Sequence, residues 1–197
     1  ELKKKGYDCF VNLCEGYPDW ETPGYDIYFN ADMLNIPVTG PSTKLFDVPK
    51  RLMKYVAYCE GVRIPAYAII DTLEEIETAT AHLKYPMFVK PAHAGDSLGV
   101  DEHSLVHNLE ELKSKCAEII DEFGPLMIDE YIAGREYTVL VAADPEDPKE
   151  CIAFRPVEYR FPEGKEFKTY SLKTSELHPD CNFPCEDEEL DKKLREA

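Results

Sequence analysis

The segment 88–100 (FVKPAHAGDSLGV) combines residue types that suit a polyphosphate. A short apolar strand would deliver Lys90 at its end, and a loop with Gly95, Ser97 and Gly99 follows. Glycines let backbone N–H groups approach phosphate oxygens, a serine adds a hydroxyl donor, and a lysine adds a positive charge. The segment lacks the Gly-Lys-Ser/Thr ending of a Walker A loop and the glycine spacing of a dinucleotide fingerprint. Taken alone, it fits a surface hairpin with turn glycines better.

A second segment places three carboxylates around a short apolar stretch. Asp129, Glu130 and Glu136 lie on either side of Tyr131 and Ile132. Carboxylates beside an apolar slot can accept hydrogen bonds from an amino group or from ribose hydroxyls while the slot holds a flat ring. An ordinary hairpin with solvated acids explains the same residues, and for this segment alone it is the better interpretation.

Alternating strands and helices are expected to position these two segments. Apolar runs predict strands at 7–14, 36–39, 67–70, 86–90, 126–129, 137–143 and 151–157. Capping residues and helical periodicity predict helices at 47–61, 72–83, 109–123 and 187–197. This order predicts an α+β fold of antiparallel sheets and helices. The aromatic and charged segment 159–173 fits neither pattern.

Two of the expected helices carry an apolar face that should pack inward. In the helix capped by Asn108, that face comprises Leu109, Leu112, Cys116, Ile119, Ile120 and Phe123. In the helix ending at Gly61, it comprises Leu52, Met53, Val56, Ala57 and Cys59. Thr72 and Glu75 have the spacing of a capping box.

The composition narrows the class of protein. The 197 residues carry 22 basic and 39 acidic side chains, a formal charge of −17, and 44 % are apolar. The apolar content indicates a globular protein of one or two domains. The negative charge argues against nucleic acid and against an anionic membrane surface as partners. An anion site in such a chain must depend on a few local cations.

The cysteines and the termini indicate the compartment. Seven cysteines without a Cys-x-x-Cys pair predict reduced, mostly buried thiols in a cytoplasmic protein. Cys181, Cys185 and His178 fall short of a tetrahedral zinc site. No apolar run approaches the ~20 residues of a membrane span, and residues 1–5 lack the apolar core of a signal peptide. Both ends read as interior sequence, which predicts a piece of a longer protein.

Together, and in this order, the two segments resemble the ATP-grasp superfamily and within it the D-alanine–D-alanine ligase family. The stretches 10–16 (FVNLCEG) and 35–41 (NIPVTGP) are similar to the end of that family's N-terminal domain and to its linker. Segment 88–99 resembles its strand-end lysine and mobile loop. Segment 129–136 resembles its adenosine motif, with an aspartate in place of the first glutamate.

The resemblance implies ATP and Mg²⁺ as cofactors and assigns roles to individual residues. Those assigned to the nucleotide are Lys50, Lys90, Gly95, Ser97, Gly99, Asp129, Glu130, Tyr131, Ile132, Glu136 and Lys173. Those assigned to catalysis are Lys90, Ser97 and Lys173. The lysines would hold phosphates, the stretch 129–132 would line adenine, and Glu136 would hold the ribose. The family's Mg²⁺ ligands are expected beyond residue 197, so no metal ligand is assigned within this chain.

The activity implied is ATP-dependent carboxylate–amine ligation through an acylphosphate, with the 94–99 loop excluding water. This chain would supply the nucleotide-binding part and be inactive alone. Residues 1–43 would be a remnant of an α/β N-terminal domain. Residues 44–130 would form the small ATP-grasp lobe with the glycine loop, and residues 131–197 part of the large lobe.

Other interpretations stay open. One is a catalytically inactive, ATP-grasp-like nucleotide-binding protein, and another is a purely structural α+β module. Other ATP-grasp ligases, such as glutathione-synthetase-like or carboxylase-like enzymes, would act on different substrates. The partners expected are small molecules, an amino-acid or peptide-like carboxylate and an amine, with a homodimer as one option for assembly.

Overall fold

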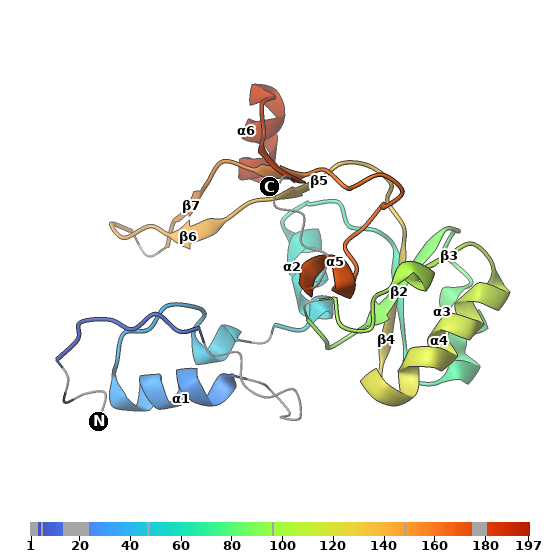
Figure 1. Ribbon diagram of the computed structural model, residues 1–197, viewed down its shortest axis with the longest axis horizontal. Coiled ribbons are helices and arrows are strands. Elements are labelled where there is room, and N and C mark those ends of the chain that lie inside the picture. The colour runs from blue at the N-terminus through green and yellow to red at the C-terminus, as the bar shows by residue number, and fades with distance from the viewer. Residues whose placement is uncertain are drawn as a thin grey trace. The chain divides into compact units, whose positions relative to one another are not determined.

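The computed structural model describes residues 4, 6–13, 24–46, 48–95, 97–147, 149–174 and 181–197, apart from the side chains of residues 173 and 174. The chain divides into two compact units, residues 1–53 and residues 54–197. Figure 1 shows the elements of both units in chain order.

The first unit contains a helix that the sequence did not predict. This helix, α1 (Tyr25–Leu34), begins after Gly24 and ends at Asn35, and both flanking residues have left-handed backbone, with φ of 79° and 50°. A 3₁₀ turn, η2 (Thr43–Leu45), follows the helix. The ring of Phe46 packs on that of Tyr28, with centroids 4.9 Å apart.

The strands predicted at 7–14 and 36–39 are wrong for the described residues. Phe10 and Val38 form one isolated parallel bridge. The N–H of Phe10 donates to Pro37 O, and the N–H of Thr39 donates to Phe10 O, each at 2.9 Å. A single bridge does not make a strand, because a strand needs a ladder of such pairs. Cys14 lies outside the described residues.

Helix α2 (Lys50–Cys59) confirms the helix predicted at 47–61, but its apolar face is not buried. Leu52, Met53 and Val56 are 48 %, 52 % and 50 % exposed. Helical periodicity identifies residues that share a face but not what covers that face. The inward packing predicted for this helix is therefore wrong.

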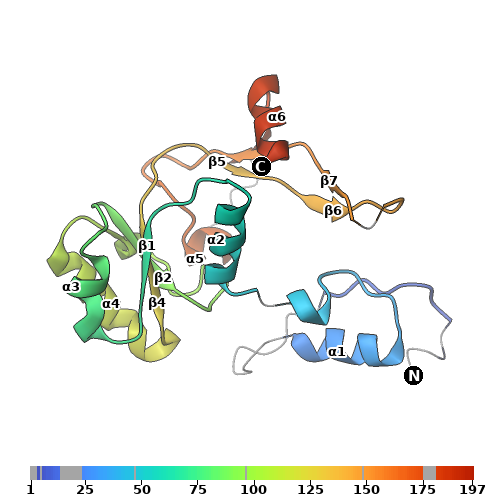
Figure 2. The ribbon, with the colours of Figure 1, turned by 180° about the vertical axis from the view of Figure 1, so that it is seen from behind.

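A four-stranded antiparallel sheet forms the centre of the second unit. Its strands are β1 (Tyr67–Ile70), β4 (Leu126–Glu130), β2 (Met87–Pro91) and β3 (Leu105–Val106), in that order across the sheet. Helices α3 (Ile76–Thr80) and α4 (Leu109–Phe123) lie on one side of this sheet, as Figure 2 shows. The buried core lies between this side of the sheet and the two helices.

The N-terminus of α4 forms as predicted, whereas that of α3 does not. Asn108 Oδ1 accepts a hydrogen bond from the N–H of Glu111 at 3.0 Å and caps α4. Thr72 makes no capping hydrogen bond, and a 3₁₀ turn, η3 (Leu73–Glu75), precedes α3. Glu75 Oε2 instead accepts from the N–H of Asp71 at 2.9 Å. The helix predicted at 72–83 is therefore a short one, because this turn replaces its first residues.

The rest of the second unit holds short strands. A three-stranded sheet contains β5 (Glu136–Thr138), β8 (Val157–Tyr159) and β9 (Asn182–Pro184). Strands β6 (Val141–Ala143) and β7 (Cys151–Ala153) form a separate hairpin. Each of the strands predicted at 137–143 and 151–157 is thus divided between two sheets.

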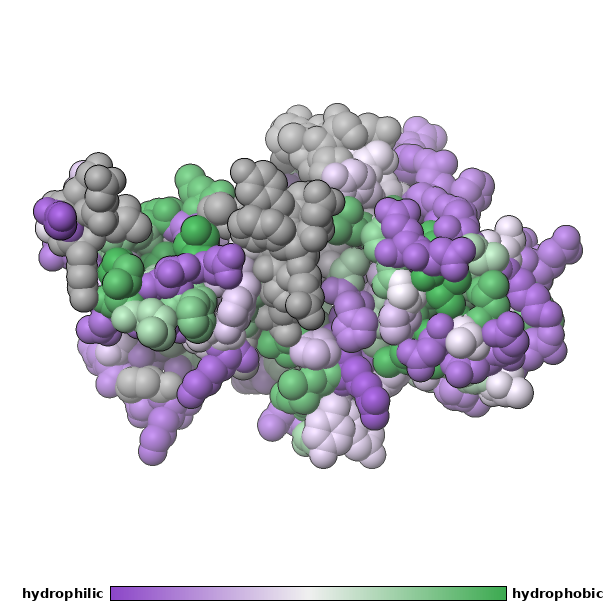
Figure 3. Space-filling model, turned by 90° about the horizontal axis from the view of Figure 1, so that it is seen from below, coloured by the Kyte–Doolittle hydropathy of each residue, from purple (hydrophilic) through white to green (hydrophobic). Residues whose placement is uncertain are grey.

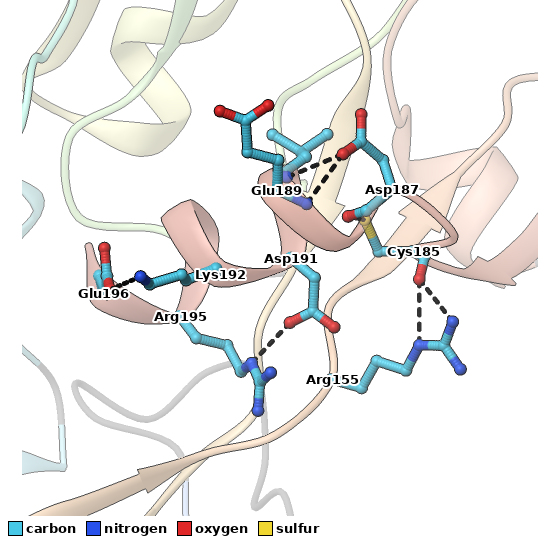
Figure 4. A network of polar contacts seen from close by, with 9 residues as sticks. Arg155, Cys185, Asp187, Glu189, Asp191, Lys192, Arg195 and Glu196 are labelled. Atoms are coloured by element: carbon cyan, nitrogen blue, oxygen red, sulfur yellow. Dashed lines mark hydrogen bonds and ion pairs between the residues drawn. The ribbon is translucent and has the colours of Figure 1, made fainter.

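The C-terminal helix α6 (Glu188–Glu196) forms as predicted and follows directly from β9. Asp187 Oδ1 accepts hydrogen bonds from the N–H groups of Glu189 and Leu190, at 3.1 and 3.0 Å. The Arg155 guanidinium donates to the carbonyl of Cys185 at 2.6 and 3.0 Å (Figure 4). These bonds cap the helix and fix the chain leading into it. The short helix α5 (Tyr170–Thr174) lies between β8 and β9 in the chain.

The cysteines differ from the expectation of mostly buried thiols. Cys116 and Cys185 are buried, Cys181 is half-buried, and three others, Cys9, Cys59 and Cys151, are exposed. Apolar side chains also reach the surface, where Figure 3 shows them among charged ones. In the part of the chain that the structure describes, no helix is both long and apolar enough to cross a membrane.

Candidate functional site

The side of the four-stranded sheet that faces away from the core carries polar and aromatic side chains. In the register of the sheet, Asp129 lies between Tyr67 and Phe88, and Lys90 lies opposite Met127. Directly paired residues point to the same side of a sheet, and so do residues two apart along a strand. These five side chains therefore share the side opposite the core.

Asp129 joins two lysines from different elements. Its Oδ2 lies 2.6 Å from Lys90 Nζ, and its Oδ1 lies 2.9 Å from Lys54 Nζ on α2. The Asp129 side chain is 7 % exposed. Its Oδ1 accepts no hydrogen bond from the described residues, so Lys54 neutralises it as an ion pair. Lys54 Nζ also lies 4.7 Å from the centre of the Tyr67 ring, a cation–π contact.

This cluster of Lys54, Lys90 and Asp129 has spare positive charge. Two ammonium groups and one carboxylate leave a local charge of +1 in a chain of formal charge −17. Each ammonium has three N–H donors, and a single carboxylate cannot use all of them. The cluster can therefore accept a further anion, such as a phosphate oxygen.

Three aromatic rings lie beside the charged cluster. The centroid of Phe88 is 4.9 Å from that of Phe167 and 6.3 Å from that of Tyr131. Burial raises the pKa of the Tyr131 phenol, and Glu166 and Glu136 raise it further. The phenol therefore stays protonated and donates to the carbonyl of Glu166 at 3.1 Å. Rings with such geometry offer flat apolar surface for a heterocyclic base.

The segment 166–170 connects the charged cluster and its neighbouring rings with the glycine loop (residues 94–99) and with the three-stranded sheet. Ser97 Oγ donates to the carbonyl of Lys168 at 3.3 Å, and the N–H of Tyr170 donates to Val100 O at 3.2 Å. Lys168 Nζ pairs with Glu136 at 2.7 Å and lies 4.1 Å from the centre of the Tyr159 ring. A cavity of about 570 Å³ is lined by residues 164–167, Thr169, Glu102, Leu105 and His107.

The glycine loop forms two internal turns. The N–H of Leu98 donates to Gly95 O, and that of Val100 donates to Ser97 O. Gly99 has φ of 72°, and a Cβ there would lie 2.8 Å from Pro91 Cγ, so only glycine fits without strain. Ser97 has φ of 60°. These two N–H groups are occupied in this conformation, so the loop must rearrange before they can bind phosphate. Asp96 lies outside the described residues.

The structure brings together some of the predicted site residues. Lys90 contacts Asp129, and Ser97 and Glu136 both contact Lys168. Glu130 accepts a hydrogen bond from the N–H of Lys84 at 2.9 Å, which stabilises the chain before β2.

Other predicted residues are not placed in the site. Ile132 is 68 % exposed. Lys50 begins α2 and belongs to the first unit, whereas Lys90 lies on β2 in the second unit. Lys173 lies in α5, but its side chain is outside the described residues.

Sequence reasoning missed Lys54, Phe167 and Lys168. Lys54 follows Lys50 by one helical turn, but spacing within a helix does not reveal a partner 75 positions along the chain. Phe167 and Lys168 lie in the segment that fitted neither strand nor helix. No signal in the sequence marks these three residues.

A metal site would need several ligands close together. Among the described residues, no group of three or more histidine, cysteine, aspartate or glutamate side chains could hold a metal ion.

Comparison with known proteins defines the class. The family model described as "D-ala D-ala ligase C-terminus" matches residues 61–196. The D-Ala:D-Ser ligase VanG from Enterococcus faecalis has a similar structure, with a TM-score of 0.71 and 21 % identity, over 96 % of this chain and 53 % of that chain. The predicted α+β, ATP-grasp-like fold is confirmed.

The chain belongs to the D-alanine–D-alanine ligase family. A D-alanine–D-alanine ligase from Bordetella petrii is 30 % identical over 72 % of this chain and 42 % of its own length. Another, from Delftia acidovorans, is 27 % identical over 95 % of this chain and 56 % of its own length. The Bacillus anthracis enzyme complexed with ATP has a TM-score of 0.65 at 19 % identity, over 100 % of this chain and 59 % of that one. The chain thus spans about half the length of these relatives.

Proposed function

We propose that the protein is an ATP-dependent carboxylate–amine ligase in which this chain binds the nucleotide. One observation carries the proposal: the cluster of Lys54, Lys90 and Asp129 lies beside the rings of Phe88 and Phe167 on one side of the sheet. Cations next to flat apolar surface suit a nucleotide, because its phosphates are anionic and its base is aromatic. Family membership supports the same function.

The phosphates would bind at the lysines and the glycine loop. Lys90, Lys50 and Lys173 would neutralise negative charge as it moves between phosphate oxygens in the transition state. Ser97 would donate its hydroxyl, and residues 94–99, including Gly95 and Gly99, would exclude water from the reactive intermediate.

The nucleoside would bind at the segment 129–136. Tyr131, Ile132 and the chain at 129–130 would line adenine. Glu136 would accept hydrogen bonds from the ribose hydroxyls, with Lys168 holding its carboxylate in place at 2.7 Å.

The reaction would proceed in two steps. An oxygen of the substrate carboxylate attacks the γ-phosphorus of ATP, which forms an acylphosphate and releases ADP. The nitrogen of the amine then attacks the acyl carbon, loses a proton, and expels inorganic phosphate to leave an amide. Among the described residues, no group of three or more potential ligands could hold a metal ion. The Mg²⁺ ligands would lie outside these residues, and no step is assigned to the ion.

The family points to amino acids as substrates. The relatives are named for D-alanine, and VanG for D-alanine and D-serine. We therefore propose two D-amino acids as the carboxylate and the amine. The three-part division at residues 43 and 130, a cytoplasmic location, a homodimer and independence from nucleic acid and membranes also remain proposals.

Phosphate release from ATP by the full-length protein, measured with a panel of D-amino acids and their L-enantiomers, tests the function. A ligase should release phosphate and form a dipeptide with a D-amino acid only. Tight ATP binding without phosphate release would favour the alternative, a nucleotide-binding protein without ligase activity. The absence of both would contradict the proposal.

A further inference from the structure

The two lysines that contact the carboxylate of Asp129 differ in their exposure. Lys54 contacts Oδ1 and Lys90 contacts Oδ2, so each lysine has an oxygen of its own. Lys54 is 12 % exposed and Lys90 is 27 % exposed. Lys54 is also held over the Tyr67 ring. Lys90 is thus the more accessible of the two ammonium groups, and Lys54 is the more firmly enclosed.

This inequality matters once Lys90 binds a phosphate. Asp129 is almost fully buried, and a buried carboxylate that loses its only counter-ion is strongly destabilised. With Lys54 in place, Asp129 keeps one counter-ion when Lys90 turns away. Without Lys54, the carboxylate would retain Lys90 and compete with the phosphate for it.

We propose that Lys54 is a positioning residue that holds Asp129 so that Lys90 is released to the phosphates of the nucleotide. Lys54 acts through Asp129 and does not itself contact the nucleotide. This inference rests on the proposed function, because it assumes that Lys90 binds phosphate. The sequence motifs do not include Lys54, and they do not explain why Asp129 is buried; the inference accounts for both.

The test compares ADP with adenosine, which lacks phosphate. Calorimetry gives both dissociation constants, and their ratio isolates the part of binding that depends on phosphate. Lys54→Met should weaken ADP binding at least tenfold and leave adenosine binding within twofold. Lys54→Arg keeps the charge and should retain most of the ADP affinity. Lys113→Met, which removes an exposed lysine paired with Glu77, is the matched control and should change neither.

The double variant Lys54→Met/Asp129→Asn separates a positioning role from direct contact. Without a charged carboxylate, Lys90 no longer needs to be released. The dissociation constant of adenosine divided by that of ADP should therefore equal the value for the single variant Asp129→Asn. A ratio that stays low in the double variant would mean that Lys54 binds phosphate directly, and would overturn the inference.

Three further outcomes would also overturn the inference. If Lys54→Met weakens adenosine and ADP equally, while Lys54→Arg restores both, the residue only supports the fold. If the unaltered protein binds neither compound, the proposed function itself fails. If the unaltered protein binds both ADP and adenosine, and Lys54→Met leaves the ratio of their dissociation constants unchanged, this inference alone is refuted. Thermal melting of each variant shows whether it is folded.

Discussion

The two sides of the four-stranded sheet differ completely although the same strands build both. Val89 and Ile128 are fully buried against the helices on one side, and their direct neighbours Lys90 and Asp129 form the charged cluster on the other. The pleat of a strand makes this possible, because successive side chains point to opposite sides. One residue step therefore separates the residues that stabilise the fold from those that we propose bind the nucleotide.

The largest effect is expected on the core side. Ile128→Ala removes most of a fully buried side chain, and such truncations cost about 2 to 5 kcal/mol of the free energy of unfolding. Denaturant unfolding measures this loss. Affinity for ADP, measured on the folded fraction, should change little. If nucleotide affinity fell as much as stability, the two sides would not be separable.

Lys90→Ala should have the reverse effect. It removes a cation that we propose binds phosphate, and charge-assisted hydrogen bonds are worth about 1.5 to 3 kcal/mol, roughly 10- to 150-fold in the dissociation constant of ATP. Stability should change less than in Ile128→Ala, because Lys54 still pairs with Asp129. Calorimetry measures the affinity for ATP, and phosphate release measures turnover. If both were unchanged, Lys90 would not be part of the site.

The helix that covers the core side gives a smaller effect. Asn108→Ala deletes the capping bond of α4 and should cost about 1 kcal/mol. Thr72→Ala is the matched comparison, because Thr72 makes no capping bond, and its cost should be clearly smaller. Equal losses in thermal or denaturant unfolding would show that the two helix starts do not differ in this way.

The smallest effect concerns pH. Burial raises the pKa of Asp101, but its hydrogen bond and ion pair with Lys115 outweigh this and hold the pKa below the ordinary 3.8. A lowered carboxyl pKa adds stability above the ordinary value and loses it as the pH falls through the lowered one. Asp101→Asn should therefore be less stable than the unaltered protein at neutral pH and should lose less stability in acid. Parallel curves of stability against pH would contradict this.

The comparison of α4 with α2 shows that a helical pattern predicts an apolar face but not its burial. Both sequences predicted an apolar face, yet Leu112, Cys116 and Ile119 of α4 are buried, whereas Leu52 and Met53 of α2 are about half exposed. The cap of α4 and the pattern along it are local, so they can be read from neighbouring residues. Burial depends on a partner surface supplied by another part of the chain. The reactivity of thiols follows the same rule: burial in the core raises the pKa of Cys116 to about 12, while Cys151 is exposed.

The strands show a similar division. The runs at 67–70, 86–90 and 126–129 were predicted and correspond to β1, β2 and β4, since each is a continuous apolar run bounded by turn residues. The runs at 137–143 and 151–157 were also apolar, but each contributes to two sheets. A local pattern cannot predict this, because a strand ends where its pairing partner ends.

The residue order alone places Lys90 one position from a core valine and Asp129 one position from a core isoleucine, because alternation is a property of any strand. It also sets the glycine loop directly after the lysine. The contact of Asp129 with Lys54 came from folding, which packs a helix against a strand 75 positions further along the chain. Such a pair has no local periodicity, and the enclosure of the carboxylate that makes it matter exists only once the layers are assembled.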